Sequence, residues 1–441
     1  MHLRPILAAL LLAATAACDR PAEVAGPNDA AALSHGDRIR ALCDADNGGL
    51  TLWPGFCALV VHDATYLDGT PARARHVAVA PNGDVFVAVQ GSGGGVLALR
   101  DTDGNLRADQ TARFGTGGGH GIAYAHPYLY FARNDRVERY LMNGSLTPVG
   151  GPEIIVSGMP GTGDHGTKTI VVAGGSLFVN LGSASDVCQQ ANRQPGSPGV
   201  DPCPELPTRS GVWRYDANTV GQVHNTAARY ATGTRNMVAL AFRAADGMLY
   251  GVQHGRDNLN LYWPALFSRQ DQAEMPSEEF FRIRPGADYG WPYCYHDPRQ
   301  RRKVLGPEYG GNGTIVGRCA SAERPILFFP AHWAPNGLLF YAGTHFPEKF
   351  RGGAFVAFHG GHNRPGSIRE EGFNVVFVPF IDGKPGRIQV FIDGFIGPDA
   401  VNLPADADHR PVGLAQGPDG SLYVTDDRGG RIWRVLHAGR D

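Results

Sequence analysis

The chain has 441 residues, 43% of them hydrophobic, with 60 glycines, 32 prolines and a formal net charge of −2. This composition excludes a broadly disordered chain, and the many turn-forming residues favour an all-β protein over a helical one. The near-neutral charge supplies no overall field for nucleic acid or for an anionic membrane surface, so neither is expected as a partner.

The N-terminus predicts an export signal. Arg4 precedes an apolar stretch that ends in small residues and is too short to span a bilayer. We therefore interpret residues 1–17 as a signal peptide and residues 18–40, rich in Ala, Pro and Asp, as a flexible tether. The segment from 41 to 441 remains for the folded domain.

Cys18 directly follows the predicted signal peptide. The small residues before it resemble a bacterial lipobox, although Thr15 stands where Leu is usual. Two outcomes stay open. Lipidation of Cys18 would anchor the protein at the periplasmic side of the envelope, whereas ordinary cleavage near Ala17 would give a soluble periplasmic or secreted product.

The six remaining cysteines fall into three neighbouring pairs, which are Cys43 with Cys57, Cys188 with Cys203, and Cys294 with Cys319. An exported chain enters an oxidising compartment, so three loop-closing disulfides are expected. Metal thiolates are the weaker alternative because the chain has no C-x-x-C, and it has no C-x-x-C-H for covalent haem.

Six similar units follow along the chain, each with a polar or cationic residue before an apolar run that a turn closes. They lie at 75–89, 120–135, 165–183, 235–253, 332–343 and 410–427. Repeated strand–turn–strand units of this kind predict a six-bladed β-propeller of four-stranded antiparallel sheets. The strand-like segment 56–62 is expected to pair with 431–436, which would close the ring and remove its exposed edges.

The residue that starts each unit is expected to occupy an equivalent place in every blade. These residues are His76, His120, His165, Arg235, His332 and Arg410. Since the innermost strand of each propeller blade lines the axis, the six side chains should surround one mouth of a central channel.

Two segments are too long for simple turns. Residues 184–211 contain the Cys188 and Cys203 pair, and residues 256–330 include the aromatic, glycine-rich run GADYGWPYCYHD. Such insertions on a rigid scaffold often contact substrate. The alternative, that the aromatic residues only pack the insertion onto the ring, stays open.

From about residue 73 to 436 the chain resembles the pyrroloquinoline quinone (PQQ) dependent sugar dehydrogenases, and within them the L-sorbosone dehydrogenase-like branch. The matching segments, in family order, are 95–109, 165–183, 234–242, 286–295, 329–343, 350–364 and 409–427. The resemblance implies a propeller that binds PQQ with Ca²⁺ on its axis and oxidises an aldose or a sugar-derived aldehyde. Electrons would pass to an external cytochrome or quinone, and a monomer or dimer is expected.

The resemblance also assigns roles to residues. His165 matches the catalytic base, and Arg235 with Asn236 matches a cofactor-binding pair in which the arginine steadies charge on the quinone oxygen. Arg410 matches a second cofactor-binding arginine, and Arg364 matches the arginine of an Asn-Arg pair. The remaining cofactor candidates are His332 and His120. A structural role is expected for His76, and each isolated histidine has that alternative.

Calcium is expected at the backbone carbonyls of Gly255 and Arg256, which match the calcium loop of soluble relatives. Here the sequence departs from the family, because 258–261 replaces the usual Leu-Gly and acidic pair. A second acidic loop has Asp101, Asp103, Asn105 and Asp109 at near-alternating spacing. We interpret it as a solvated turn rather than as a structural calcium site, since Leu106 stands where Gly is expected.

Two other function classes remain. One is a propeller lactonase or other hydrolase with an axial metal, which the His, Arg and Asn residues at the unit starts disfavour, since such metals need carboxylates. The other is a non-catalytic lipoprotein that binds sugars or partner proteins through the same mouth, which the fold alone does not exclude.

Overall fold

Strands dominate the described part of the chain, which comprises residues 34–361, 363–364, 368–399 and 401–439 of the computed structural model. The predicted signal peptide, Cys18 and most of the tether lie outside these residues. The last part of the predicted tether is described and contains helix α1, His35–Arg40. No helix within the described ranges has the length and apolar character needed to cross a membrane.

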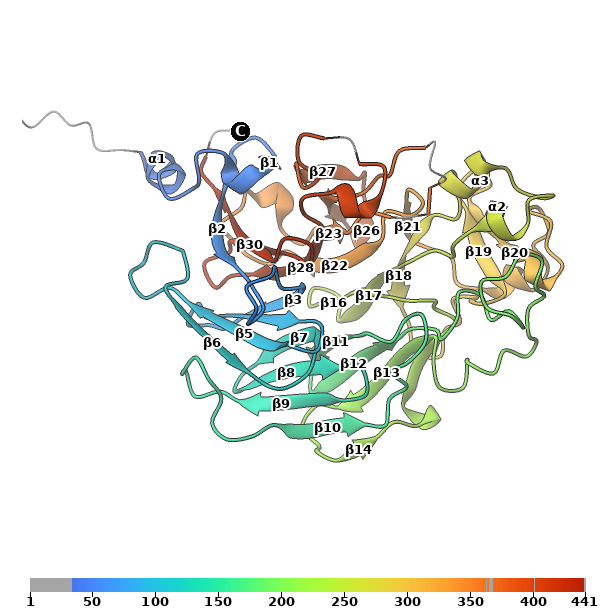
Figure 1. Cartoon of the computed structure of the whole chain (residues 1–441), viewed down its shortest axis with the longest axis horizontal. Coiled ribbons are helices and arrows are strands. Elements are labelled where there is room, and N and C mark those ends of the chain that lie inside the picture. Colours follow the sequence, from blue (N-terminus) through green and yellow to red (C-terminus); the bar gives the residue numbers. More distant parts are fainter. Residues whose placement is uncertain (1–33, 362, 365–367, 400, 440–441) are drawn as a thin grey trace, which may run out of the picture. The chain divides into compact units, whose positions relative to one another are not determined.

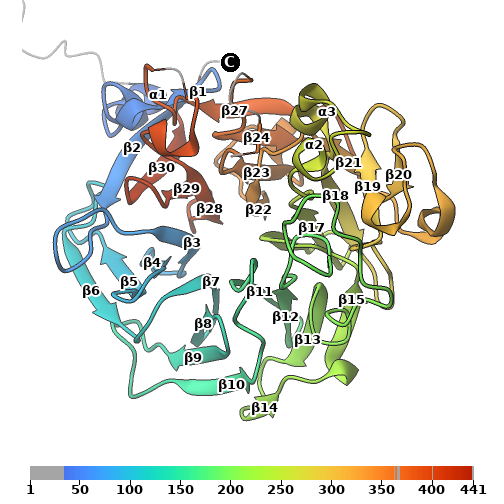
Figure 2. The ribbon, with the colours of Figure 1, turned by 45° about the vertical axis from the view of Figure 1, so that its right-hand side comes forward.

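Six sheets of four or five strands surround a common axis in the described residues, as Figures 1 and 2 show, with the innermost strand of each nearest the centre. Blades 1 to 3 follow one another along the chain. From the axis outward, their strands are β3 (Ala74–Val79), β4 (Val85–Val89), β5 (Gly95–Arg100) and β6 (Gln110–Phe114) in blade 1; β7 (Gly119–Ala125), β8 (Tyr128–Arg133), β9 (Val137–Leu141), β10 (Glu153–Ser157) and β14 (Gln222–Val223) in blade 2; and β11 (Lys168–Ala173), β12 (Ser176–Leu181), β13 (Gly211–Asp216) and β15 (Arg229–Thr232) in blade 3.

The second half of the ring repeats this arrangement. From the axis outward, the strands are β16 (Ala239–Arg243), β17 (Met248–Gln253), β18 (Glu278–Ile283) and β21 (Leu327–Phe329) in blade 4; β22 (Pro335–Phe340), β23 (Ala354–Phe358), β24 (Asn374–Val378), β27 (Gln389–Asp393) and β1 (Thr51–Leu52) in blade 5; and β28 (Pro411–Gln416), β29 (Leu422–Asp426), β30 (Arg431–His437) and β2 (Phe56–Asp63) in blade 6. The predicted six-bladed propeller is confirmed.

Short elements decorate the ring. They are α2 (Leu259–Tyr262), α3 (Arg269–Glu274), the hairpins β19 (Cys294–Asp297) with β20 (Arg302–Leu305) and β25 (Phe380–Ile381) with β26 (Lys384–Pro385), and 3-10 turns at Asn47–Gly49, Thr226–Ala228, Pro307–Tyr309, Gly317–Ser321, Glu348–Phe350 and Pro404–Asp406.

Each blade is buried on both faces, which explains why its inner strands are continuous apolar runs. In β4 all five residues are buried. Val85, Val87 and Val89 pack toward blade 6, while Phe86 and Ala88 pack toward blade 2. Because successive side chains of a strand point to opposite faces, one apolar run serves two interfaces. The core is therefore divided among the six interfaces between neighbouring blades.

The first and last strands of the ring lie in the same blade. Residues from Phe56 to Asp63 of β2 pair antiparallel with Arg431 to His437 of β30. This pairing confirms the predicted ring closure, and Figure 1 shows β2 beside β30 near the labelled C-terminus.

Two predictions about local structure were wrong. The unit at 332–343 is not a strand–turn–strand pair, because β22 runs through Asn336 and Gly337 as one strand with a bulge after Pro335. The segment 256–330 is not only an insertion, since it supplies β18 and β21, the two outer strands of blade 4. The α2, α3 and β19–β20 portions are true insertions between or beside those strands.

The three predicted disulfides are present, as Cys43–Cys57, Cys188–Cys203 and Cys294–Cys319. The last one closes the longest loop, with a sequence separation of 25 residues. It ties β19 to the 3-10 turn Gly317–Ser321, beside blade 4.

Removal of the Cys294–Cys319 disulfide is expected to destabilise the fold. Replacing both cysteines by serine should lower the free energy of unfolding by about 2–4 kcal/mol, since the cross-link restricts the unfolded chain. Urea denaturation of the oxidised protein and of the double variant measures the difference. Reducing agent should then shift the midpoint of the variant less than that of the parent protein, and an equal shift would contradict the prediction.

Candidate functional site

A central pocket of about 330 Å³ lies at the N-terminal ends of the inner strands, lined by residues of blades 1, 3, 4 and 5. Most of the predicted site residues meet there. Those that line the pocket are His165, Arg235, Asn236, Gly255 and His332. Sequence-distant segments therefore converge around the axis, and His165 and Arg235 share one rim.

His165 precedes β11 and has a fixed ring orientation. Its Nδ1 lies 2.9 Å from the hydroxyl oxygen of Ser183, and that hydroxyl donates to the carbonyl of Ser185 at 2.6 Å. Since the hydroxyl proton of Ser183 is used, its oxygen accepts, and Nδ1 of His165 carries the proton. The lone pair is then on Nε2. Burial and the nearby Arg235 hold the pKa of His165 well below its usual value, so the ring is neutral at pH 7.

Arg235 is buried between two carboxylates. Its guanidinium donates to Asp186 at 2.9 Å and to Asp257 at 2.8 Å, and only 5% of its side chain is exposed. Asp186 is fully buried, and burial raises its pKa despite Arg235. A large part of the arginine's charge is therefore balanced by the protein itself, which fixes the side chain in one position beside the pocket.

Asp257 connects three parts of the site. It accepts from Arg235, from Arg193 at 3.0 Å and from the side-chain amide of Asn363 at 2.7 Å. Arg193 comes from the 184–211 loop that the Cys188–Cys203 disulfide closes. None of Arg193, Asp186 and Asp257 was predicted from the sequence, because nothing local marks a loop arginine as a partner for a carboxylate 64 residues away.

His332 and His120 occupy different depths. His332 lines the central pocket with 7% exposure, and its Nε2 donates to the carbonyl of Gln272 at 2.7 Å. His120 is fully buried inside β7, where its Nδ1 accepts from Arg75 at 2.8 Å. His76 lies inside β3, against His120, and donates to the carbonyl of Asn336. The unit starts are thus not equivalent along the axis.

Arg410 and Arg364 lie outside the lining of the central pocket. Arg410 donates to the carbonyls of His359 at 2.9 Å and Gly360 at 2.5 Å, and it lines a neighbouring pocket. Arg364 pairs with Glu371 at 2.6 Å. His254 and His359 also line the central pocket, although neither was predicted from the sequence. Burial lowers the pKa of each to about 4, so both are neutral at pH 7.

The predicted calcium segment is held firmly at both sides. The N–H of Gly255 donates to Glu278 at 2.6 Å, and the Arg256 guanidinium makes two contacts with Glu308, at 2.5 and 2.8 Å. Within the described residues, no group donates a hydrogen bond to the carbonyl oxygen of Gly255 or Arg256. Free carbonyl oxygens beside the Asp257 carboxylate are ligand types that Ca²⁺ accepts, so the segment fits the predicted ion in donor chemistry.

The lining of the central pocket also fits a polyanionic quinone in its chemistry. Arg73 and Arg75 from blade 1 face the same space as Asn236 and Asn363, which supplies donors from guanidinium and amide groups. The neutral histidines add no charge, and because their N–H groups already bond within the protein, each offers its other ring nitrogen as an acceptor. Arg75 is buried and paired with Asp427, whereas the Arg73 side chain is 56% exposed and its nearest carboxylate contact is 3.8 Å. Arg73 is therefore the cation of this pocket that is most available to an anionic group.

Clusters of metal-ligating side chains lie outside the central pocket. Among the described residues, two groups bring three ligating side chains together, and neither is in the central pocket. Cys188, Cys203 and Glu205 include a disulfide. Asp101, Asp103 and Asp109 form the acidic loop, whose carboxylates accept loop N–H groups such as that of Leu106 at 2.8 Å. A solvated turn accounts for those contacts.

Residues 62–438 match the family described as TrAA12-like, which covers most of the chain. The chain belongs to the TrAA12-like family. A curated relative of this TrAA12-like chain from Borreliella burgdorferi, described as an uncharacterized protein, is 27% identical over 217 residues. That match covers 47% of this chain and 48% of the relative, so the chain spans about half the length of that relative.

Solved structures similar to the TrAA12-like chain include a calcium structure of a family AA12 enzyme from Trichoderma reesei, with a TM-score of 0.71 and 20% identity over 88% of this chain and 97% of that one. The holo PQQ domain of pyranose dehydrogenase from Coprinopsis cinerea has a TM-score of 0.69 and 19% identity over the same shares. The soluble aldose sugar dehydrogenase of Escherichia coli in its apo-form has a TM-score of 0.55 and 16% identity over 87% and 99%.

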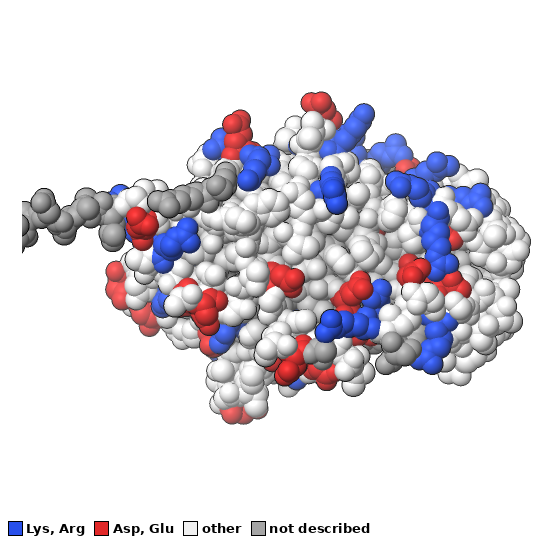
Figure 3. Space-filling model, turned by 90° about the horizontal axis from the view of Figure 1, so that it is seen from above, with Lys and Arg blue, Asp and Glu red and all other residues white. Residues whose placement is uncertain are grey.

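The resemblance to PQQ-dependent sugar dehydrogenases is thus confirmed at the level of family and fold, and the sorbosone branch stays a prediction. At these identities the solved structures establish the fold of the TrAA12-like chain rather than its substrate. On the face that Figure 3 shows, uncharged residues cover most of the surface, and both basic and acidic residues are scattered among them.

Proposed function

We propose that the protein is a PQQ-dependent dehydrogenase that oxidises an aldose or a sugar-derived aldehyde. The observation that carries the proposal is the position of His165, whose unprotonated Nε2 belongs to the same pocket as Arg235 and Asn236 in a TrAA12-like propeller. Similar solved proteins carry PQQ or oxidise sugars according to their names, which supports the cofactor and the substrate class.

Each pocket residue has a chemical task in this proposal. PQQ, when bound, supplies the quinone that takes the hydride from the sugar carbon. His165 takes the hydroxyl proton through Nε2, because Nδ1–H is held by Ser183. Arg235 is fixed by Asp186 and Asp257 and offers its remaining donor capacity to an oxygen that gains negative charge. Gly255 and Arg256 would hold Ca²⁺ through their carbonyls, and Arg73 would meet a carboxylate.

The finer assignments belong to the same proposal. The substrate is an aldose or a sorbosone-like aldehyde, electrons pass to an external cytochrome or quinone, and the protein works at the periplasmic side of the envelope. Lipidation of Cys18 would keep it at the membrane. These statements rest on the motifs and the N-terminal pattern of the sequence.

Reconstitution tests the proposal directly. Purified protein is loaded with PQQ and Ca²⁺, and reduction of an artificial electron-accepting dye is followed over a panel of aldoses and sugar aldehydes. Cofactor binding with turnover of at least one sugar supports the dehydrogenase. Failure to bind PQQ in the presence of Ca²⁺ would overturn it and favour the hydrolase or the binding protein.

The pH dependence of catalysis should reflect the neutral base. Since the pKa of His165 is held well below 6.5 and the base must be unprotonated, kcat/KM should stay level as the pH falls from 7.5 to 6. Activity should decline only in more acidic solution, as the ring gains a proton. Initial rates in overlapping buffers of constant ionic strength measure this profile. A decline centred near pH 6.5 would contradict the assignment.

A further inference from the structure

A second, larger cavity adjoins the central pocket on the side of blades 6 and 1. It has a volume of about 1030 Å³ and shares Arg73 with the central pocket. Its walls come from the segment between β2 and β3, the loop before β28, and the turn between β29 and β30. We call this cavity the outer trough. A monosaccharide in the central pocket would leave it empty, because its volume alone suits a drug-sized ligand.

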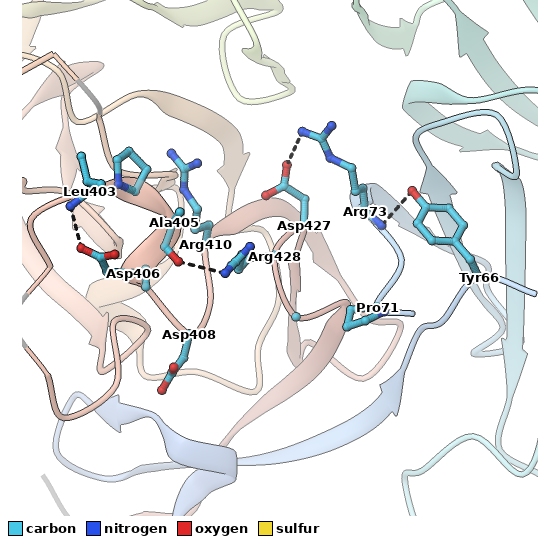
Figure 4. Close-up of a pocket in the computed structure, with 13 residues that line it drawn as sticks. Tyr66, Pro71, Arg73, Leu403, Ala405, Asp406, Asp408, Arg410, Asp427 and Arg428 are labelled. Carbon is cyan, nitrogen blue, oxygen red and sulfur yellow. Dashed lines mark hydrogen bonds and ion pairs between the residues drawn. The ribbon is translucent and has the colours of Figure 1, made fainter. Parts of the chain in front are cut away.

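Arginines line the trough in a row. Figure 4 shows Arg410, Arg428 and Arg73 in succession, with Asp427 between the last two and Tyr66 beyond them. Within the described residues, no carboxylate lies within ion-pair distance of Arg410 or Arg428. Arg428 is exposed and donates to the carbonyl of Ala405 at 2.9 Å. Each guanidinium therefore keeps donors for another partner.

The three carboxylates that line the trough differ in how far they are available to balance the charge of its arginines. Asp427 is already held by Arg75 and by His359, which donates at 2.6 Å. Asp406 accepts the N–H groups of its own loop, including that of Leu403 at 2.8 Å. Asp408 is exposed, and among the carboxylates that line the trough it is the one with no recorded hydrogen bond to another described residue. Asp427 and Asp406 are thus committed to other groups, and Arg428 keeps its charge for an anionic partner.

The trough also offers surfaces that suit sugar rings. Tyr66, Pro71 and Pro404 line it, and Leu403 is 62% exposed at its edge. The Tyr66 hydroxyl is fixed by the carbonyl of Gln90, so the ring is held in place. Flat apolar surfaces between arginines match a chain of sugars that carries a carboxylate on each unit.

We propose that the outer trough binds the acidic units of a uronic-acid-containing oligosaccharide while its reducing-end sugar occupies the central pocket. This inference rests on the proposed function for the oxidised unit, and it defines the substrate class. Arg428 holds the carboxylate of a following unit, whereas Arg73, which lines both cavities, and Arg410 keep the cofactor contacts proposed for them.

Binding is tested without turnover. The probe is trigalacturonate whose reducing end has been reduced to the alditol, so that this end no longer has the hemiacetal carbon that the proposed reaction oxidises. Calorimetry with the PQQ- and Ca²⁺-loaded protein should give a Kd that rises about tenfold in Arg428→Gln, and salt should weaken binding to the parent protein more than to the variant. Arg428→Lys should retain most of the affinity. Arg324→Gln, an exposed arginine beside blade 4, is the matched control and should change nothing.

Catalysis provides the second readout. The ratio of kcat/KM for trigalacturonate to that for cellotriose, a neutral chain of equal length, should fall about tenfold in Arg428→Gln. Equal binding of the acidic and neutral alditols, or an unchanged Kd in Arg428→Gln, overturns the inference. Loss of PQQ uptake in Arg428→Gln would also overturn it, because the trough would then belong to the cofactor. If the acidic alditol binds in a charge-dependent way but no sugar is oxidised, the inference about the trough stands and the proposed dehydrogenase function is wrong.

Discussion

Replacement of His165 by alanine is expected to lower kcat by about 10²- to 10⁴-fold, the contribution typical of a positioned general base. The structure gives the reason, since Nδ1 is committed to Ser183 and Nε2 remains for the substrate proton. Dye-linked initial rates at saturating sugar measure the effect, with PQQ content determined by absorbance.

Two observations distinguish a catalytic from a structural role for His165. The variant should bind PQQ and unfold at nearly the same urea concentration as the parent protein, since the hydrogen bonds of the ring within the described residues go to Ser183 alone. His35→Ala is the matched control, because His35 is exposed on α1 and should leave kcat unchanged. Retention of at least a third of the parent kcat in His165→Ala would remove the residue from the mechanism.

Loss of Arg235 is expected to damage stability as well as activity. In Arg235→Leu the buried Asp186 loses its ion-pair partner, and breaking a buried pair from one side costs about 3–5 kcal/mol. Asp257 is less affected because Arg193 and Asn363 still donate to it. Urea denaturation of the cofactor-free protein measures the change.

A second substitution distinguishes the stability lost with the Arg235–Asp186 ion pair from other effects of removing Arg235. Adding Asp186→Asn to Arg235→Leu removes the unpaired charge and should recover more than half of the lost stability, although activity should stay low. Independent, additive destabilisation by the two substitutions would show that Arg235 and Asp186 are not energetically coupled.

Much of the fold was predictable because its signals are local. Alternate burial on both faces makes strands such as β4 continuous apolar runs, and turns separate them at regular intervals. The prediction failed at 332–343, where Asn336 and Gly337 resemble a turn but lie within a bulged strand. There the pairing of β22 with β23 overrides the local preference for a turn.

The candidate site was predictable only in part. The repeat predicted those pocket residues that stand next to inner strands, which are His165, Arg235, Asn236 and His332. The repeat could not predict how deep each unit-start residue lies along the axis. Bulges in β3 and β7 place His76 and His120 inside those strands. Nor could it find Arg193, whose partner Asp257 is brought near by tertiary folding and not by spacing in the sequence.

The shared blade of β2 and β30 also has a kinetic consequence. Phe56 of β2 pairs with His437 of β30. The strand pairing that closes the ring can therefore form only after nearly the whole polypeptide is available. Contacts of such sequence separation are slow to form. Until then the partly folded molecule is an open arc with two unsatisfied edges, and a chain that stops short of residue 431 should persist in that aggregation-prone form.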